Sequence, residues 1–448
     1  PGSGAVAGAA PGSGAVAGAA PGSGAVAGAA PGSGAVAGAA PGSGAVAGAA
    51  PGSGAGSGVP LAEQPSFVLI TVDSLRADRL SAYGYSRQTS PHFDERARQG
   101  VLFVEARAQG PMTRFSLPSL LSGRYFTELK RTGGAWPRIA EENRLLGTRM
   151  SELGYYTATI SALFYFRRFF GLVHGFQVVD LGPAYHYPDF HQHPTGDLVT
   201  DAAIRLLPRL PTDRPFFLWL HYMDPHSDYV RHRGLPQFGL QRKDLYDGEV
   251  LYSDLQIHRF LQALAAARPR ERLVIVVTSD HGEGLDHKED HGKLFHGQHL
   301  FDNLIRVPLL VVGPGFAPRR IEAPVVVGLI DLLPTFLELA GAPADPTLAG
   351  RSLVPLLRGA AIADGPSLPV FSEKDTVLEP SLKSMIVWPY KLIWNLGLNR
   401  YMLYDLSADP LEQQDLLGRN EQLDRTLIEA FKQWRSDRLK EVPTREKL

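Results

Sequence analysis

The chain has 448 residues, with 45 lysines and arginines against 46 aspartates and glutamates, so its net charge is close to zero. No overall field therefore draws it to nucleic acid or to an acidic membrane surface, and we predict no nucleic-acid partner. Its lack of cysteine excludes disulfides, thiolate metal sites and a cysteine nucleophile.

The first 58 residues differ from all that follow. Five copies of PGSGAVAGAA precede a degenerate sixth, and no residue before Glu63 carries a charge. A proline every ten residues limits helix formation, and Gly, Ala and Ser bury too little apolar surface to offset the cost of ordering the backbone. We predict a disordered linker over 1–58, either inert or a tether, then an α/β domain over 59–365 and a C-terminal subdomain over 366–448.

From residue 66 the sequence alternates between strand and helix character. Strands are expected over 66–73, 101–106, 155–161, 215–223, 272–282 and 307–313, and helices over 90–100, 113–123, 144–154, 197–210, 245–267 and 326–341. This alternation, with nearly continuous apolar strands, predicts a three-layer α/β/α sandwich around a mostly parallel mixed sheet. In the helix over 90–100, Ser90 is the expected N-cap and Gly100 the stop.

The end of the chain has a different pattern. Short strands over 369–374, 384–395 and 401–406, followed by a final helix, predict a small α+β subdomain. No apolar run reaches the length of a membrane span, so none is predicted. Because the chain starts at Pro1 rather than methionine, an upstream signal or membrane anchor is left open.

Three polar clusters lie where ligands bind in α/β folds, beyond the carboxyl ends of the strands. Asp73 follows the first strand, where it would either bind a ligand or cap the next helix. Asp280 and His281 follow the strand that starts at residue 272, in a loop that can turn both side chains toward one cation. Thr113 and Arg114 begin a helix, where the backbone N–H groups favour an alkoxide or an anion, although Thr113 could be a simple N-cap.

A shared divalent cation would connect these clusters. Held by Asp73, Asp280 and His281, it would lower the pKa of the Thr113 hydroxyl and make it a nucleophile. The Arg114 guanidinium would supply donors for a tetrahedral oxyanion. Mn, Zn, Ca and Mg are the candidates, and the imidazole favours Mn or Zn over Ca.

The order of these segments resembles the sulfatase family of the alkaline phosphatase superfamily over most of residues 66–416. The matching segments are FVLITVDSLRADRLSAYGY, SPHFDERARQGVLFVEARA, TRFSLPSLLSGRY, HYMDPHSDY, TSDHGEG, HGQHLFDNLIRVPLLV, IDLLPTFLELAG and YKLIWN. The resemblance implies an ester hydrolase or phosphotransferase whose metal ligands are Asp73, Thr113, Asp280 and His281. It also implies that His226 and His296 contact the substrate oxyanion or protonate the leaving group.

The nucleophile segment departs from the sulfatase pattern of Cys or Ser, any residue, Pro, Ser and Arg, in which the first residue is oxidised to formylglycine. The string SLPS from Ser116 imitates it, but leucine replaces the arginine and Gly123 comes three residues early. Counting back from SLLSG places Thr113 first, as in superfamily branches that attack phosphorus directly. We therefore expect Thr113 to act on phosphoesters or phosphodiesters in preference to sulfate esters. The alternatives are a formylglycine sulfatase using Ser116, and a non-catalytic binding module on the repeat tether.

The resemblance also bears on metal number, partners and location. One metal site is expected; a second, as in the two-zinc branch, would take Asp224, His226, His296 or His299 as ligands. The expected partner is a small-molecule or envelope-polymer ester. An extracytoplasmic location is implied by the family alone.

Overall fold

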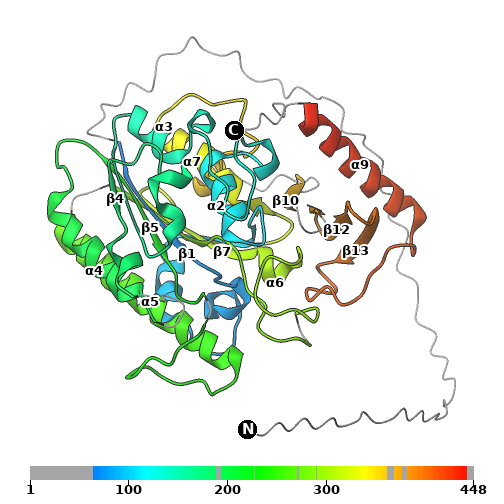
Figure 1. The fold of residues 1–448 in the computed structure, drawn as a ribbon, viewed down its shortest axis with the longest axis horizontal. Helices are drawn as coiled ribbons and strands as arrows, with labels where there is room; N and C mark the ends of the chain where they lie inside the picture. The colour runs from blue at the N-terminus through cyan, green and yellow to red at the C-terminus, as the bar shows by residue number, and fades with distance from the viewer. Residues whose placement is uncertain are drawn as a thin grey trace, which may run out of the picture. The chain divides into compact units, whose positions relative to one another are not determined.

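The computed structural model describes residues 64–440 apart from 188–192, 227, 270–271, 289, 361–367 and 376–380 (Figure 1). The predicted linker over 1–58 lies outside the described residues. Among the residues that are described, no helix is both long and apolar enough to cross a bilayer.

The main sheet has nine strands. They are β1 (Ser66–Val72), β2 (Val101–Arg107), β3 (Tyr156–Ser161), β4 (Val178–Asp180), β5 (Phe216–Tyr222), β6 (Leu273–Ser279), β7 (Arg306–Val312), β8 (Arg319–Ile321) and β9 (Val327–Gly328). Their order is β4, β3, β5, β1, β6, β7, β2, β8, with β9 also paired to β2. The central strand β1 is parallel to β5 and β6, while β7 is antiparallel to its neighbours. The predicted mostly parallel mixed sheet is confirmed.

Helices cover both faces of this sheet (Figure 1). They are α1 (Pro91–Ala97), α2 (Thr113–Ser122), α3 (Leu146–Glu152), α4 (Gly196–Leu206), α5 (Arg242–Ala267), α6 (Asp302–Ile305), α7 (Leu332–Leu339) and α8 (Val354–Leu357). One layer contains α1, α4 and α5, and the opposite layer contains α2, α3 and α7. Strands β1 and β5 are buried along their whole length, which explains their continuous apolar sequences.

A second, antiparallel sheet follows. Its strands, in order, are β10 (Val370–Lys374), β11 (Leu382–Val387), β12 (Tyr390–Asn395) and β13 (Arg400–Asp405). The helix α9 (Glu421–Lys440) packs Phe431 into the apolar cluster of this sheet. The single strand predicted over 384–395 was wrong, because β11 and β12 form a hairpin that turns at Trp388 and Pro389. Proline has no N–H for a strand ladder, so the ladder breaks there.

The second sheet also supports the loop that leads into α2. The Glu373 N–H of β10 donates to the Gln109 carbonyl at 2.9 Å, and the Ser372 hydroxyl donates to the Ala108 carbonyl at 2.6 Å. On the other side, the Ile330 N–H donates to Gln109 Oε1 at 2.7 Å. The approach to Thr113 is therefore fixed by hydrogen bonds from distant parts of the chain.

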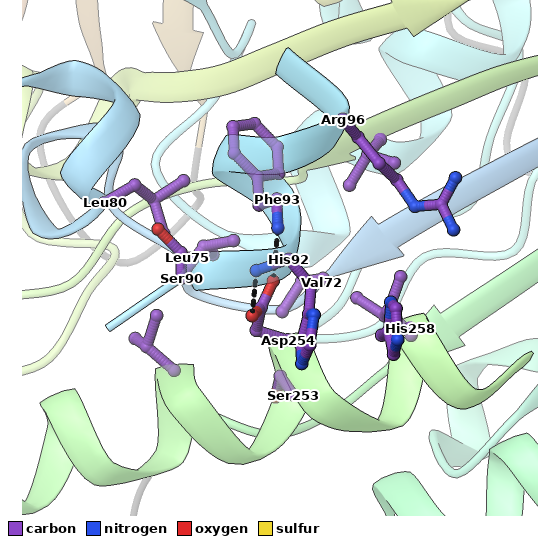
Figure 2. Close-up of a pocket in the computed structure, with 13 residues that line it drawn as sticks. Val72, Leu75, Leu80, Ser90, His92, Phe93, Arg96, Ser253, Asp254 and His258 are labelled. Atoms are coloured by element: carbon purple, nitrogen blue, oxygen red, sulfur yellow. Dashed lines mark hydrogen bonds between the residues drawn. The ribbon is translucent and has the colours of Figure 1, made fainter. Parts of the chain in front are cut away.

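The sequence predicts Ser90 as the N-cap of helix α1. In the structure, a residue of α5 caps this helix instead. Both carboxylate oxygens of Asp254 accept backbone N–H groups, from His92 at 2.9 Å and from Phe93 at 2.7 Å (Figure 2). The Ser90 hydroxyl instead contacts Asp94 at 3.1 Å. The helix ends at Ala97, before the predicted stop.

Asp254 should make stability depend on pH. Burial raises its pKa to about 7, although its two backbone donors oppose the rise. A carboxyl with a higher pKa in the folded state stabilises the fold at low pH and loses that contribution as the pH rises through the folded value. Thermal melts should therefore show the parent losing stability relative to Asp254→Asn between about pH 4 and about pH 7. A constant difference over this range would contradict the shift.

Candidate active site

The three predicted clusters meet at the carboxyl ends of β1 and β6. Asp73 directly follows β1, and Asp280 and His281 directly follow β6, the parallel neighbour of β1. Each of these three residues offers a ligand atom, and the three atoms lie within 4.8 Å of one another; all three side chains are buried. Parallel pairing brings the two strand ends together, so residues about 200 positions apart lie side by side.

Thr113 completes the group from the first turn of α2. Its Oγ1 lies 3.2 Å from Asp73 Oδ2 and 3.1 Å from His281 Nε2. Met112, in extended conformation, occupies the N-cap position, and no side chain caps the helix there. The Thr113 hydroxyl thus faces the acidic group, and the simple N-cap interpretation does not hold.

The donor set fits a cation. The Nδ1 of His281 lies 2.8 Å from the Gly282 carbonyl, an acceptor, so Nδ1 carries the hydrogen and the Nε2 lone pair faces Thr113 and Asp73. Asp280 Oδ1 accepts the N–H of His281 at 2.9 Å. Its Oδ2 is buried and has no hydrogen-bond partner within the part of the chain that is described. A buried carboxylate oxygen without a hydrogen-bond donor, next to an imidazole lone pair and a second carboxylate, is suited to contact a cation.

Burial and mutual repulsion oppose the simultaneous ionisation of Asp73 and Asp280. Burial, and then the charge of Asp73, raise the pKa of Asp280 well above its usual range. Burial also acts to raise the pKa of Asp73, but the imidazoles of His226, His221 and His281 outweigh it and hold that pKa well below the usual range. Burial, followed by repulsion from His296, lowers the pKa of His281 to about 3. A bound cation would allow both acids to ionise.

The two other predicted histidines also lie at this site. The His296 ring is 4.5 Å from that of His281 and 5.1 Å from that of His226, measured between centroids. Nδ1 of His296 lies 3.2 Å from both oxygens of Glu283. Burial acts to lower the pKa of His296, but Glu283 reverses this and raises it. His296 is therefore suited to hold a proton next to Asp73, Asp280 and His281, the candidate metal-binding group.

Arg114 and Ser116 differ in their surroundings. The Nη1 of Arg114 donates to the Ala135 carbonyl at 2.8 Å, and its positive charge opposes protonation of His296. Arg114 thus lies near the site while anchored to a neighbouring loop. Ser116 Oγ is buried and makes no hydrogen bond to any described residue.

Among the described residues, the four side chains considered for a second metal do not make up a group with metal-binding spacing. Asp224 accepts hydrogen bonds from Thr195, and the His299 ring lies 4.9 Å from that of Phe301. Across the described ranges, the cluster of Asp73, Asp280 and His281 is the one group of three or more such side chains with metal-binding spacing.

Two residues of the site were missed from the sequence. Glu283 lies within the TSDHGEG segment, where adjacency to the acid and histidine could have indicated it. His221 lies inside the apolar segment FFLWLHY, and its Nε2 is 3.4 Å from Asp73 Oδ2. A histidine in a fully buried strand was the available signal.

The sulfatase family model matches residues 65–342, and the chain belongs to this family of ester hydrolases. A second model, N-sulphoglucosamine sulphohydrolase C-terminal, matches residues 290–437. The Δ4,5-hexuronate-2-O-sulfatase of Bacteroides thetaiotaomicron is 25% identical over 417 residues, covering 79% of this chain and 85% of that protein.

Solved structures show the same fold. A 2-O GAG sulfatase aligns with a TM-score of 0.68 at 22% identity, covering 85% of this chain and 93% of that one. The phosphonate monoester hydrolase of Agrobacterium radiobacter aligns with a TM-score of 0.69 at 18% identity, covering 84% and 96%. The fold therefore hosts proteins named for sulfate esters and for phosphonate esters.

Proposed function

We propose that this sulfatase-family chain is a metal-dependent phosphoester or phosphodiester hydrolase with Thr113 as its nucleophile. One observation carries the proposal: Thr113 Oγ1 lies 3.2 Å from Asp73 and 3.1 Å from His281, inside the group suited to a cation. A divalent cation held by Asp73, Asp280 and His281 would act as a Lewis acid on the ester and lower the pKa of the hydroxyl.

Thr113 performs the first step. Its Oγ1 forms a bond to phosphorus while the bond from phosphorus to the leaving alcohol breaks. The hydroxyl proton has Asp73 Oδ2, 3.2 Å away, as its acceptor. The N–H groups and the dipole at the start of α2 favour negative charge at this position. Arg114 supplies guanidinium donors for the oxyanion.

His296 completes the reaction. Its imidazolium, maintained by Glu283, gives a proton to the leaving oxygen. The neutral ring then takes a proton from the water that attacks phosphorus. The bond from phosphorus to Thr113 Oγ1 breaks, and Oγ1 takes back its proton from Asp73. His226, whose ring is 5.1 Å from that of His296, would contact the phosphoryl oxygens.

Threonine favours phosphorus over sulfur for a chemical reason. A threonine ester has no second hydroxyl on the same carbon, so the transferred group cannot leave by collapse to an aldehyde. Water must therefore attack the phosphorus or sulfur atom itself. For phosphorus, this attack proceeds through a transition state that charged residues and metal ions stabilise well.

Sulfate-ester hydrolysis is the second candidate, because the relatives include the hexuronate sulfatase. The substrate would be a small-molecule or envelope-polymer ester, and the proposed location, outside the cytoplasm, rests on the family resemblance. A formylglycine at Ser116 and a non-catalytic binding role are the remaining alternatives.

Turnover of four aryl esters tests the proposal. After dialysis against EDTA, the protein is given para-nitrophenyl phosphate, bis-para-nitrophenyl phosphate, para-nitrophenyl phenylphosphonate or para-nitrophenyl sulfate, with Mn, Zn, Ca or Mg. We expect metal-dependent turnover with kcat/KM about 10-fold or more higher for the best phosphorus ester than for the sulfate. The reverse order would support the sulfatase candidate. No turnover and no metal binding would support the non-catalytic role.

A further inference from the structure

We propose that His221 is a positioning residue: a hydrogen-bond relay from Trp219 through Thr71 fixes its tautomer, so that its Nε2–H orients the carboxylate of Asp73. The inference deepens the proposed function and rests on it for the role of Asp73. Its geometry, however, can be tested without any activity.

The relay joins two neighbouring strands. Thr71 of β1 and His221 of β5 are register partners, and both are fully buried. Trp219 Nε1 lies 2.9 Å from Thr71 Oγ1, which lies 2.8 Å from His221 Nδ1. The other ring nitrogen, Nε2, lies 3.4 Å from Asp73 Oδ2. Four side chains thus form one line that ends at the metal-binding group.

The direction of the relay follows from what each group can donate. An indole N–H only donates, so Trp219 uses one lone pair of Thr71 Oγ1. The single hydroxyl hydrogen of Thr71 can go to His221 Nδ1 at 2.8 Å or to the Leu220 carbonyl at 3.5 Å. The shorter contact is the stronger one. Nδ1 is then an acceptor, and the neutral ring carries its hydrogen on Nε2.

The hydrogen on His221 Nε2 points toward one acceptor, the carboxylate of Asp73. His221 Nε2 is buried and makes no standard hydrogen bond to the described residues. A buried N–H without an acceptor is costly, and the Asp73 carboxylate is the acceptor it faces. The Phe166 ring stacks on the imidazole at a centroid distance of 5.0 Å and keeps its plane fixed.

The relay determines how Asp73 presents its oxygens. Asp73 Oδ1 accepts from the Ser74 hydroxyl at 2.9 Å, while Oδ2 faces Thr113 and His221. With both sides restrained, the carboxylate cannot rotate away from the cation or from the nucleophile. Loss of such an outer partner typically weakens metal binding about 10- to 100-fold.

The first test reads the tautomer directly. Protein labelled with ¹⁵N-histidine is examined by long-range ¹H–¹⁵N NMR, with His221→Gln identifying the His221 signals. We expect hydrogen on Nε2 and a hydrogen-bonded, unprotonated Nδ1. Hydrogen on Nδ1, or on both nitrogens, would overturn the relay.

The second test compares two substitutions of one residue. Thr71→Val removes the hydroxyl but keeps the shape, while Thr71→Ser keeps the hydroxyl. Calorimetric titration with Mn²⁺ should give a Kd raised about 10- to 100-fold in Thr71→Val, with Thr71→Ser within about 3-fold of the parent. Trp219→Phe, which removes the donor and keeps an aromatic ring, should also weaken binding and serves if Thr71→Val does not fold.

The outcomes separate the two proposals. Equal Mn²⁺ affinity in the parent, Thr71→Val and Trp219→Phe would overturn the positioning role of His221. If the parent binds no divalent cation, the proposed function fails, while the NMR measurement still decides the tautomer.

Discussion

Thr113→Ala is expected to lower kcat for the best aryl phosphoester on the order of 10⁴-fold or more, because the substitution removes the hydroxyl that contacts both Asp73 and His281. Thr113→Ser, which keeps the oxygen, should retain measurable turnover. The measurement is steady-state hydrolysis with the metal that supports the parent best. When the parent protein is quenched with acid during turnover, the peptide that contains Thr113 should carry a phosphoryl group.

Ser116→Ala is the matched control for this prediction. Ser116 lies three residues further along the same helix, and its buried hydroxyl has no hydrogen-bond partner among the described residues. Its loss should change kcat less than about 3-fold. If Ser116→Ala abolishes turnover while Thr113→Ala does not, Thr113 is not the nucleophile. A peptide mass showing the loss of two hydrogens at Ser116 would point instead to formylglycine.

Asp280→Asn is expected to destroy metal binding while stabilising the metal-free protein. The substitution removes one of two buried acids whose repulsion, after burial itself, raises the pKa of Asp280. We expect the Mn²⁺ Kd to rise about 100-fold or more, and the free energy of unfolding in EDTA to increase by about 1–3 kcal/mol. Calorimetric titration and thermal melts in EDTA measure the two effects.

Asp302→Asn provides the opposite control. Asp302 is also a buried acid, but it is paired with Arg107 at 2.6 Å and with Lys391 at 2.8 Å. Burial acts to raise its pKa, but these cations lower it well below the usual range. Its neutralisation removes one of the two acid partners of each cation, leaving Glu105 with Arg107 and Glu412 with Lys391, and should destabilise the protein by about 1.5–3 kcal/mol. A loss of stability in both variants would contradict our account of Asp280.

The sequence was sufficient to predict the parts of the fold and site that depend on local pattern. Apolar runs located the strands, and the acids directly after β1 and β6 pointed to a shared cation because parallel strand ends lie together. The cap of α1 could not be predicted in this way. Ser90 stands at the expected position, but Asp254, more than 160 residues away, makes the contacts.

The other differences between the predicted and the observed structure also arise from contacts between separate segments of the chain. The hairpin within 384–395 depends on how two short strands pair, which an uninterrupted apolar segment does not reveal. His221 resembles an ordinary core residue until β1 and β5 are brought into register. The proximity of residues at strand ends was therefore predictable, whereas contacts made across the sheet required the tertiary structure.

The contacts of β10 with residues 108 and 109 have a consequence for biosynthesis. The ribosome makes β10 more than 250 residues after the segment that it holds in place. Nascent chains released before that point should fold much of the α/β layers yet lack a correctly placed attacking oxygen. Competence for the proposed hydrolysis would thus be among the last properties gained during translation.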